Sequence, residues 1–138
     1  MESILRTATK KRTLKTFVEG VYKSDLNQIL EEKGPFTVFV PNDNAFAKLP
    51  QATISELLKD KERLRDLISY HICPGKLTLI ELTKTRSLAT LGGAHIALRP
   101  ENDLLWINQT KIIEQDILCQ NGIIHILYQV LYPYGEHF

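Results

Sequence analysis

The sequence lacks three features that would each assign it to a specialised class of protein: a long hydrophobic run, a disulfide framework and an excess of one charge. No apolar stretch approaches the length that spans a bilayer. The opening segment MESILRTATKKR also lacks the continuous apolar core of a secretory signal. We therefore expect a soluble chain without a membrane span, either cytosolic or a mature domain from which a signal has been removed.

The charges of the chain are nearly balanced. Seventeen Lys and Arg residues stand against sixteen Asp and Glu residues, which leaves a formal net charge of +1. No overall field therefore favours nucleic acid or an anionic membrane. The basic run TKKRTLK at residues 9–15 is a local exception, which we interpret as a solvated helix face. We expect no nucleic-acid partner.

Cysteine is scarce, with only Cys73 and Cys119 in the chain. Two cysteines are too few for a disulfide scaffold, and they are either two buried thiols or one long-range bridge. With His71 and His125 they make a set of four zinc-ligand residues, but the close Cys-x-x-Cys spacing of zinc sites is missing. The sequence therefore predicts no metal site.

Catalytic signatures are missing as well. The chain has no Gly-x-Ser-x-Gly elbow, and Gly75-Lys76 lacks the earlier glycine of a phosphate-binding loop. We therefore predict a protein that is not an enzyme and that uses no cofactor.

What the chain does contain is the composition and pattern of one ordinary domain, which we place at residues 1–138. Its residues are 43% hydrophobic and 24% charged, as in soluble globular proteins. Helical spacing dominates the first part, with a capping box predicted at Thr53 and Glu56 and another at Thr78 and Glu81. From Ser87 onward short strand-like runs follow one another between turn residues. This order predicts an α+β fold.

One histidine, His125, lies in the middle of the apolar run NGIIHILYQVL. It could be a metal ligand, a catalytic base or a core residue. Because side chains alternate along a strand and both faces of this one are apolar, we expect both faces to be covered. An unpaired nitrogen of a buried imidazole costs about 1 to 3 kcal/mol. We therefore predict that His125 forms hydrogen bonds to backbone or to a polar side chain, with Thr37 and Asn42 as candidate neighbours.

Three stretches follow one another in order: GPFTVFVPNDNAFAKLP at residues 34–50, YHICPGKLT at residues 70–78 and NGIIHILYQVLYP at residues 121–133. Together they resemble the motifs of the fasciclin-like domain family, and the likeness extends from about residue 5 to residue 133. The resemblance implies a wedge-like β-sandwich of about seven strands with several helices packed at one side. It also implies that the motif residues are scaffold, namely Phe36, Thr37, Phe39, Pro41, Asn42, Phe46, Asn121, Gly122 and His125.

The resemblance further implies a binding module of cell adhesion, secreted or attached to a cell surface. Its partner would be a cell-surface or matrix protein or a glycan, and we expect the chain to be a monomer. One family pattern predicts partner contact by Asp116 and Ile117, in EQDILCQNG. A second predicts contact by the Tyr-His segment, here Leu67, Ile68, Tyr70, His71 and Ile72.

An alternative function and two departures from the family pattern complete the expectations. The alternative is a small-molecule or lipid-binding domain with a cleft between the helices and the sheet. Tyr128 stands where the second motif usually carries an acidic residue, and Cys73 and Cys119 replace small or aliphatic residues. The triplet Asn108-Gln109-Thr110 matches a glycosylation sequon, which we interpret as a turn between strands.

Overall fold

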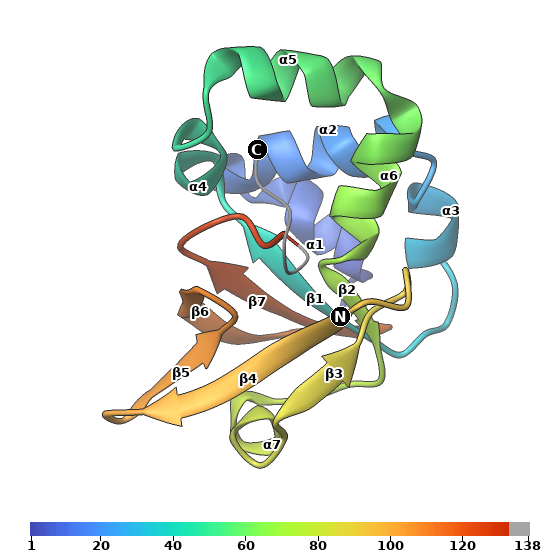
Figure 1. Cartoon of the computed structure of the whole chain (residues 1–138). Helices are drawn as coiled ribbons and strands as arrows, with labels where there is room; N and C mark the ends of the chain where they lie inside the picture. Colours follow the sequence, from blue (N-terminus) through green and yellow to red (C-terminus); the bar gives the residue numbers. More distant parts are fainter. Residues whose placement is uncertain (133–138) are drawn as a thin grey trace.

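The computed structural model describes residues 1–132, and Pro133 of the last motif lies outside the described residues. Within them the chain forms seven α-helices, one 3-10 helix and seven strands, which confirms the α+β prediction (Figure 1). The helices are α1 (Ile4–Lys10), a 3-10 turn (Arg12–Leu14), α2 (Lys15–Lys23), α3 (Asn27–Leu30), α4 (Asp43–Ala47), α5 (Gln51–Lys59), α6 (Lys61–Ser69) and α7 (Leu79–Thr83). The strands are β1 (Phe36–Pro41), β2 (Ile72–Pro74), β3 (Ser87–Ala89), β4 (His95–Glu101), β5 (Leu104–Ile107), β6 (Thr110–Cys119) and β7 (Gly122–Leu127).

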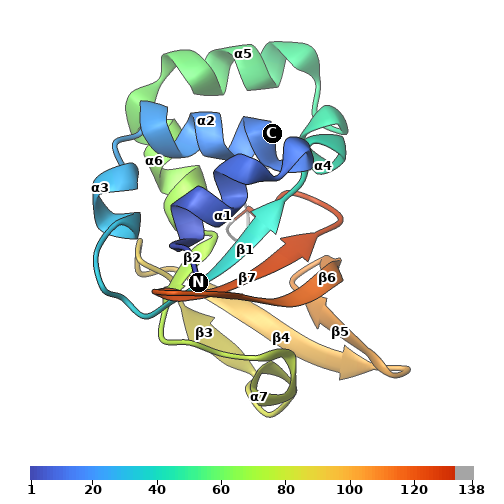
Figure 2. The same ribbon diagram turned by 180° about the vertical axis from the view of Figure 1, so that it is seen from behind.

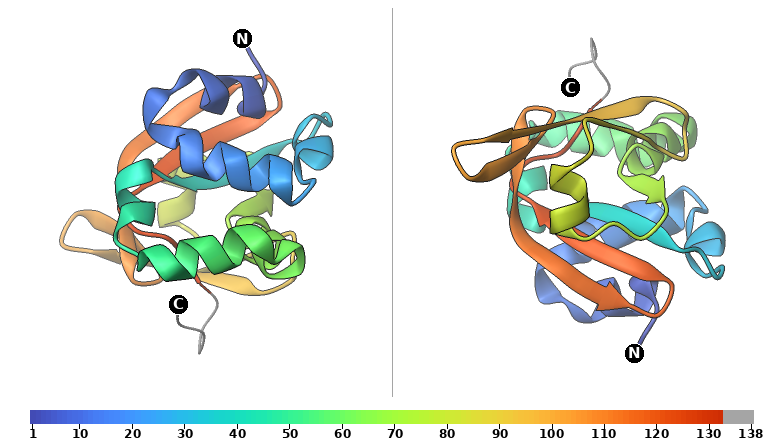
Figure 3. Two further views of the ribbon diagram at one scale, coloured as in Figure 1. Left: turned by 90° about the horizontal axis from the view of Figure 1, so that it is seen from above. Right: turned by 90° about the horizontal axis from the view of Figure 1, so that it is seen from below.

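The seven strands form one sheet in the order β2-β1-β7-β6-β5-β4-β3. All neighbours are antiparallel except β1 and β7, which run parallel with Thr37 opposite Ile123 and Phe39 opposite His125. The sheet curls until its two ends approach each other, where Leu91 N donates to Ile72 O at 2.9 Å. Helices α1–α6 lie on one side of it, and α7 lies within the curve of the strands (Figures 2 and 3).

Local capping signals set several helix ends. Asn42 accepts a hydrogen bond from Ala45 N and caps the start of α4. Asp60 accepts one from Arg63 N and caps the start of α6. The capping box predicted at Thr78 and Glu81 begins α7, as expected. The box predicted at Thr53 is wrong, because α5 begins earlier at Gln51, directly after Pro50. Proline suits a helix start, since its φ is preset and the missing N–H has no partner there.

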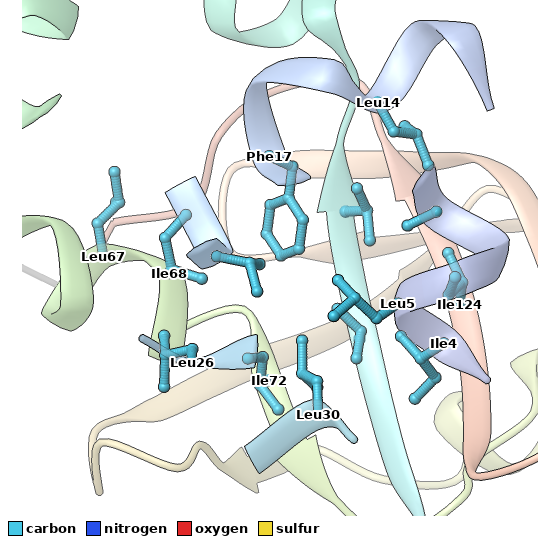
Figure 4. Close-up of a cluster of buried hydrophobic side chains, with 14 of the residues drawn as sticks. Ile4, Leu5, Leu14, Phe17, Leu26, Leu30, Leu67, Ile68, Ile72 and Ile124 are labelled. Carbon is cyan, nitrogen blue, oxygen red and sulfur yellow. The ribbon is translucent and has the colours of Figure 1, made fainter. Parts of the chain in front are cut away.

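The larger hydrophobic core lies between the helical layer and the β1–β7 pair. It gathers Ile4, Leu5, Leu14, Phe17, Leu26, Leu30, Leu67, Ile68, Ile72 and Ile124, among others (Figure 4). Phe36, Val38 and Val40 of β1 face this core, together with Ile126 of β7. Period-2 alternation therefore gives one face of the parallel pair to the helices.

A second core fills the inside of the curled sheet. Phe39, Leu98, Ile107 and Leu127 project into it from four strands, and Leu82 of α7 closes it from below. Both faces of β1 and β7 are consequently covered, and every residue of these two strands is buried. This explains why the two signature motifs read as almost continuous apolar runs.

Asn121, just before β7, ties three separate segments together. Its side-chain oxygen accepts a hydrogen bond from Ile4 N at 2.8 Å, and its amide nitrogen donates to Leu30 O at 2.7 Å and Glu32 O at 2.9 Å. Its backbone oxygen accepts from Phe36 N at 3.0 Å. A single buried side chain thus joins α1 and the end of α3 to the start of the parallel strands.

Gly122 permits the close approach of β1 to β7 at this point. Its φ is +155°, and a Cβ there would lie 2.0 Å from Phe36 O, a separation that no side chain tolerates. Glycine is therefore required by space as well as by conformation.

We predict that Asn121→Ala lowers the free energy of unfolding by about 3 kcal/mol, because one buried donor and two carbonyls lose their partner. Urea unfolding at neutral pH measures the change. Gln120→Ala is the matched control, since Gln120 is exposed and contributes its backbone N–H, which alanine keeps, to Glu2 O. A loss below 1 kcal/mol for Asn121→Ala would show that these bonds are dispensable.

Candidate functional site

His125 lies at the centre of β7 and is completely buried. Its ring stacks on Phe39 of the neighbouring strand, with centroids 5.7 Å apart and planes inclined by 25°. Nε2 lies 2.9 Å from Leu77 O, and Nδ1 lies 3.1 Å from Asp116 N. Since a carbonyl can only accept and an amide can only donate, the ring is neutral with its proton on Nε2.

The environment of His125 opposes protonation. Burial lowers the pKa of the imidazole, although the Leu77 carbonyl and the Asp116 carboxylate act in the opposite direction. The nearest Asp116 oxygen is 3.9 Å from Nδ1. Both ring nitrogens are thus used in structural hydrogen bonds, which leaves neither for a substrate or a metal ion.

Thr37 and Asn42, the predicted neighbours of His125, are not its hydrogen-bond partners. Asn42 caps α4, whereas the Thr37 hydroxyl donates to Gly75 O and accepts from Leu77 N. Thr37 therefore fixes the same loop whose Leu77 carbonyl accepts the hydrogen bond from His125 Nε2. Sequence reasoning missed Leu77, since a backbone carbonyl leaves no signal in a residue pattern.

Asp116 adopts an unusual backbone conformation in the middle of β6. Its φ is +57°, and the pairing of β6 with β7 shifts register between Glu114 and Ile117. The bulge turns its backbone N–H toward His125 and its carboxylate toward α7, where Oδ1 accepts from Leu79 N at 2.9 Å. The side chain is 34% exposed, and Ile117 is half-buried. The predicted contact pair thus lies at the surface while supporting the interior.

The Tyr-His segment faces inward. The five predicted contact residues are all buried: Leu67, Ile68, Tyr70, His71 and Ile72. His71 Nδ1 donates to Leu67 O at 2.8 Å, and Nε2 accepts from Leu131 N at 2.9 Å. In the folded domain these side chains are not available to a partner, so the candidate contact set reduces to Asp116 and Ile117.

The two cysteines are separate free thiols. Cys73 belongs to the inner core and Cys119 to the core beneath the helices, so the sheet lies between their side chains. Burial raises the pKa of Cys73 to about 12, which keeps the thiol protonated. Among residues 1–132, no group of three or more His, Cys, Asp or Glu side chains lies close enough to hold a metal ion.

Asn108 is a turn residue, as the sequence predicts. It has a φ of +51° between β5 and β6, and its amide group bridges Ala97 N and the Tyr70 hydroxyl, at 2.8 Å and 2.9 Å. The hydroxyl of Thr110, the third sequon residue, is buried. The amide that glycosylation would modify is therefore occupied in the folded domain.

One hollow lies between a helix and the sheet: it has a volume of about 340 Å³, is open to solvent, and is lined by Leu79 and Thr83 of α7 and by residues 100–105 of β4, β5 and the turn between them. An apolar hollow lies instead between helices α2, α4, α5 and α6, and its volume of about 10 Å³ suits about one water molecule. A wider hollow of about 710 Å³ lies beside α1 and has a polar rim that includes Glu2, Arg6 and Lys10. No helix in residues 1–132 is long and apolar enough to cross a bilayer.

Comparison with known proteins identifies the fold family. The sequence model of the Fasciclin domain matches residues 12–133, which is most of the chain. The chain belongs to the fasciclin domain family. The protein sll1735 of Synechocystis is 36% identical over 131 residues, with 95% of this chain and 98% of that protein covered.

Other members of the fasciclin family come from distant organisms. Human periostin is 36% identical over 120 residues, which covers 86% of this chain but only 14% of periostin. The cell surface glycolipoprotein MPB83 of Mycobacterium bovis is 30% identical and is covered over 54% of its length. A solved fasciclin domain pair from the insect cell adhesion molecule fasciclin I superposes with a TM-score of 0.85 at 19% identity, over 95% of this chain and 51% of that one.

Tyr128, which departs from the fasciclin pattern, has two cationic neighbours. Lys48 Nζ lies 3.0 Å from the ring centroid and donates to Tyr128 O at 2.8 Å, while Lys111 Nζ lies 5.7 Å from the centroid. The ring is 48% exposed. Its π-electrons stabilise the cations that an acidic residue would otherwise neutralise.

We predict that His125→Ala lowers the free energy of unfolding by about 3 kcal/mol, because the Leu77 carbonyl and the Asp116 N–H lose their partner inside the fold. Thermal and urea unfolding measure the loss. The matched control is His95→Ala, since His95 is exposed and its ring bonds to Ser87 at the surface. An equal effect of the two variants would contradict the structural role of His125.

We also predict that acid destabilises the fasciclin fold through His71. Burial, partly opposed by the hydrogen bond to Leu67 O, lowers its pKa from 6.5 to about 4. The unfolded chain therefore binds a proton that the folded chain does not, so stability is complete above pH 6.5 and falls toward pH 4, by about 3 kcal/mol. His125 contributes in the same direction.

Urea unfolding at several pH values between 7 and 4.5 measures this effect. His71→Gln should reduce the slope by up to one proton, about 1.4 kcal/mol per pH unit. Comparison of variants removes the contribution of the carboxylates, which is common to all. Identical slopes for the wild type and His71→Gln would refute the assignment.

Proposed function

We propose that this chain is a non-enzymatic binding module, exported or held at a cell surface, that mediates adhesion to a surface or matrix component. Relatives support this direction, since one is named a cell surface glycolipoprotein and another structure comes from a cell adhesion molecule. The proposal assigns binding to rigid surface complementarity on the sheet.

The interior supports a non-catalytic role. Both ring nitrogens of His71 and of His125 form hydrogen bonds with the backbone. A general base needs a nitrogen that can reach a substrate proton, and neither ring has one. The polar groups of the core therefore serve the fold.

The observation that carries the proposal is the bulge of β6 around Asp116. Asp116 is partly exposed there, Leu118 follows at 50% exposure, and Ile80 is 69% exposed beside the Leu79 amide that Asp116 binds. Large hydrophobic side chains next to a carboxylate on a rigid bulge form a surface that suits a partner. We therefore propose that the segment 116–118 of β6, which includes Ile117, forms the adhesion surface together with Ile80.

Adhesion of beads that carry the purified chain tests this proposal. Beads are applied to cells, or to extracted matrix, of the organism that encodes the chain, and retained beads are counted under flow. We expect the double variant Leu118→Ser/Ile80→Ser to reduce retention at least fivefold, because the exposed apolar surface is removed. The control Tyr22→Ser removes a large side chain on α2 that is 48% exposed, close to the 50% of Leu118.

Asp116→Asn isolates the charge, since an amide oxygen can still accept from Leu79 N. Melting temperatures establish that each variant is folded. Beads that fail to adhere with the wild-type chain would refute the adhesive function, and equal retention of all variants would refute the assigned surface.

A further inference from the structure

The helical layer covers β1, β7 and the end of β6 at residues 117–119. Among residues 1–132, no helix lies over the outer face of β4, β5 and the first residues of β6. In Figures 1 and 2, β5 and β6 lie beyond α4 on the same side of the molecule. Leu104 and Ile113 on these strands are each 47% exposed, although both are large and hydrophobic. An uncovered face of this kind marks an interaction surface.

Five residues form a continuous row across this face, which we call the outer strip: Arg99, Trp106, Lys111, Tyr128 and Lys48. Arg99 of β4 is directly opposite Trp106 of β5, and Trp106 is directly opposite Lys111 of β6. Tyr128 N then donates to Lys111 O at 3.1 Å, and Lys48 at the end of α4 donates to Tyr128 O.

Strand alternation sets the direction of the outer strip. Leu98, Ile107, Ile112 and Leu127 each adjoin a residue of the strip and belong to, or pack against, the inner core. Directly opposed residues share one face, and neighbours in sequence take opposite faces. The strip therefore points away from the inner core, along the solvent side of the curled sheet.

Cations and aromatic rings alternate along the outer strip. The Arg99 guanidinium carbon is 5.7 Å from the Trp106 centroid, and the ammonium groups of Lys111 and Lys48 lie 5.7 Å and 3.0 Å from the Tyr128 centroid. Because neighbouring strands are about 4.8 Å apart, the backbone positions of Arg99 and Lys111, two strands apart, are separated by about 10 Å.

The strip retains positive charge after its acidic neighbours are counted. Glu101 pairs with Arg99 at 3.0 Å, and Glu114 pairs with Lys11 rather than with the strip. Within residues 1–132, neither Lys48 nor Lys111 forms an ion pair with a carboxylate. Two ammonium groups on one tyrosine ring repel each other, and an anion bound between them would relieve this repulsion.

We propose that the outer strip binds a linear anionic polysaccharide in which an acidic sugar alternates with a neutral one. Each carboxylate or sulfate would meet a cation, and a neutral ring would lie against Trp106. This assignment rests on the proposed adhesive function, and it names a ligand class and a second surface, separate from the β6 bulge.

Two other linear anions fit the strip less well. On one face of an extended acidic peptide the side chains repeat every ~7 Å, which is shorter than the ~10 Å between the backbone positions of Arg99 and Lys111. A single-stranded nucleic acid needs open aromatic faces for its bases. Lys48 lies against the Tyr128 ring at 3.0 Å and occupies one of these faces.

The tryptophan of the strip offers a direct measurement, since Trp106 is the only tryptophan of the chain. The full chain is titrated with an oligosaccharide of alternating glucuronate and N-acetylglucosamine, and the emission of Trp106 is recorded together with calorimetric binding. We expect a saturable change in emission and weaker binding as salt increases, because ammonium–carboxylate attraction is screened.

Charge reversal localises the site. Lys111→Glu and Lys48→Glu should each weaken binding at least tenfold, while Lys111→Arg keeps it within about threefold. The matched control is Lys33→Glu, which makes the same change of net charge at an exposed position between α3 and β1. Should a reversal variant fail to fold, Lys111→Gln provides the same comparison without adding a negative charge.

Several outcomes would overturn the proposal: no binding, equal binding of neutral dextran, tighter binding of a polyglutamate peptide or of oligo-dT, or equal loss in Lys33→Glu. Calorimetric binding without any change in Trp106 emission would place the ligand elsewhere and would also overturn it. The bead assay separates this failure from that of the adhesive function. If beads with the wild-type chain and beads with Lys111→Glu both adhere equally well, the polysaccharide site is refuted and the adhesive function stands.

Discussion

The structure depends most on the parallel contact between β1 and β7, which brings residue 36 beside residue 122. Asn121 and Gly122 make this contact possible in different ways. The Asn121 side chain satisfies backbone groups of Ile4, Leu30 and Glu32, which the turning chain would otherwise bury without partners, and Gly122 leaves room for the Phe36 carbonyl. Both large cores are built on the two faces of this strand pair, so its register decides which side chains enter each core.

Two buried histidines likewise provide hydrogen bonds to backbone groups in the segments that flank these strands. His125 joins β7 to the loop before α7 and to the bulge of β6, and His71 joins the end of α6 to the segment that follows β7. A neutral imidazole suits these positions, because it offers one donor and one acceptor on opposite sides of a flat ring. No aliphatic residue of similar size could satisfy the same backbone groups, so a polar side chain persists inside an apolar run.

The sequence predicted the elements better than the contacts between them. Alternation in NGIIHILYQVL and the capping box at Thr78 depend on neighbours in the chain, and both features are confirmed. Leu77 and Lys48 could not be found this way, because they reach His125 and Tyr128 from distant segments. The predicted capping box of α5 at Thr53 is wrong for a local reason, since Pro50 favours an earlier helix start, at Gln51. Burial of His71 follows from local helical spacing, since it continues the stripe of Leu67 and Ile68. Tyr70 instead enters the inner core of the curled sheet.

Helices cover part of the outer face of the sheet and leave the rest exposed, and the exposed part is the surface proposed for ligand binding. Along β7 the outward side chains Ile124 and Ile126 are covered by helices, and the next residue on that face, Tyr128, is 48% exposed. At this boundary the pattern changes from aliphatic residues to aromatic rings with lysine neighbours. Aliphatic side chains that stay in water contribute no burial free energy to stability. Aromatic rings next to cations stay solvated and keep apolar area available for a ligand. The same alternation that builds the core therefore continues past the last helix as a surface suited to recognition.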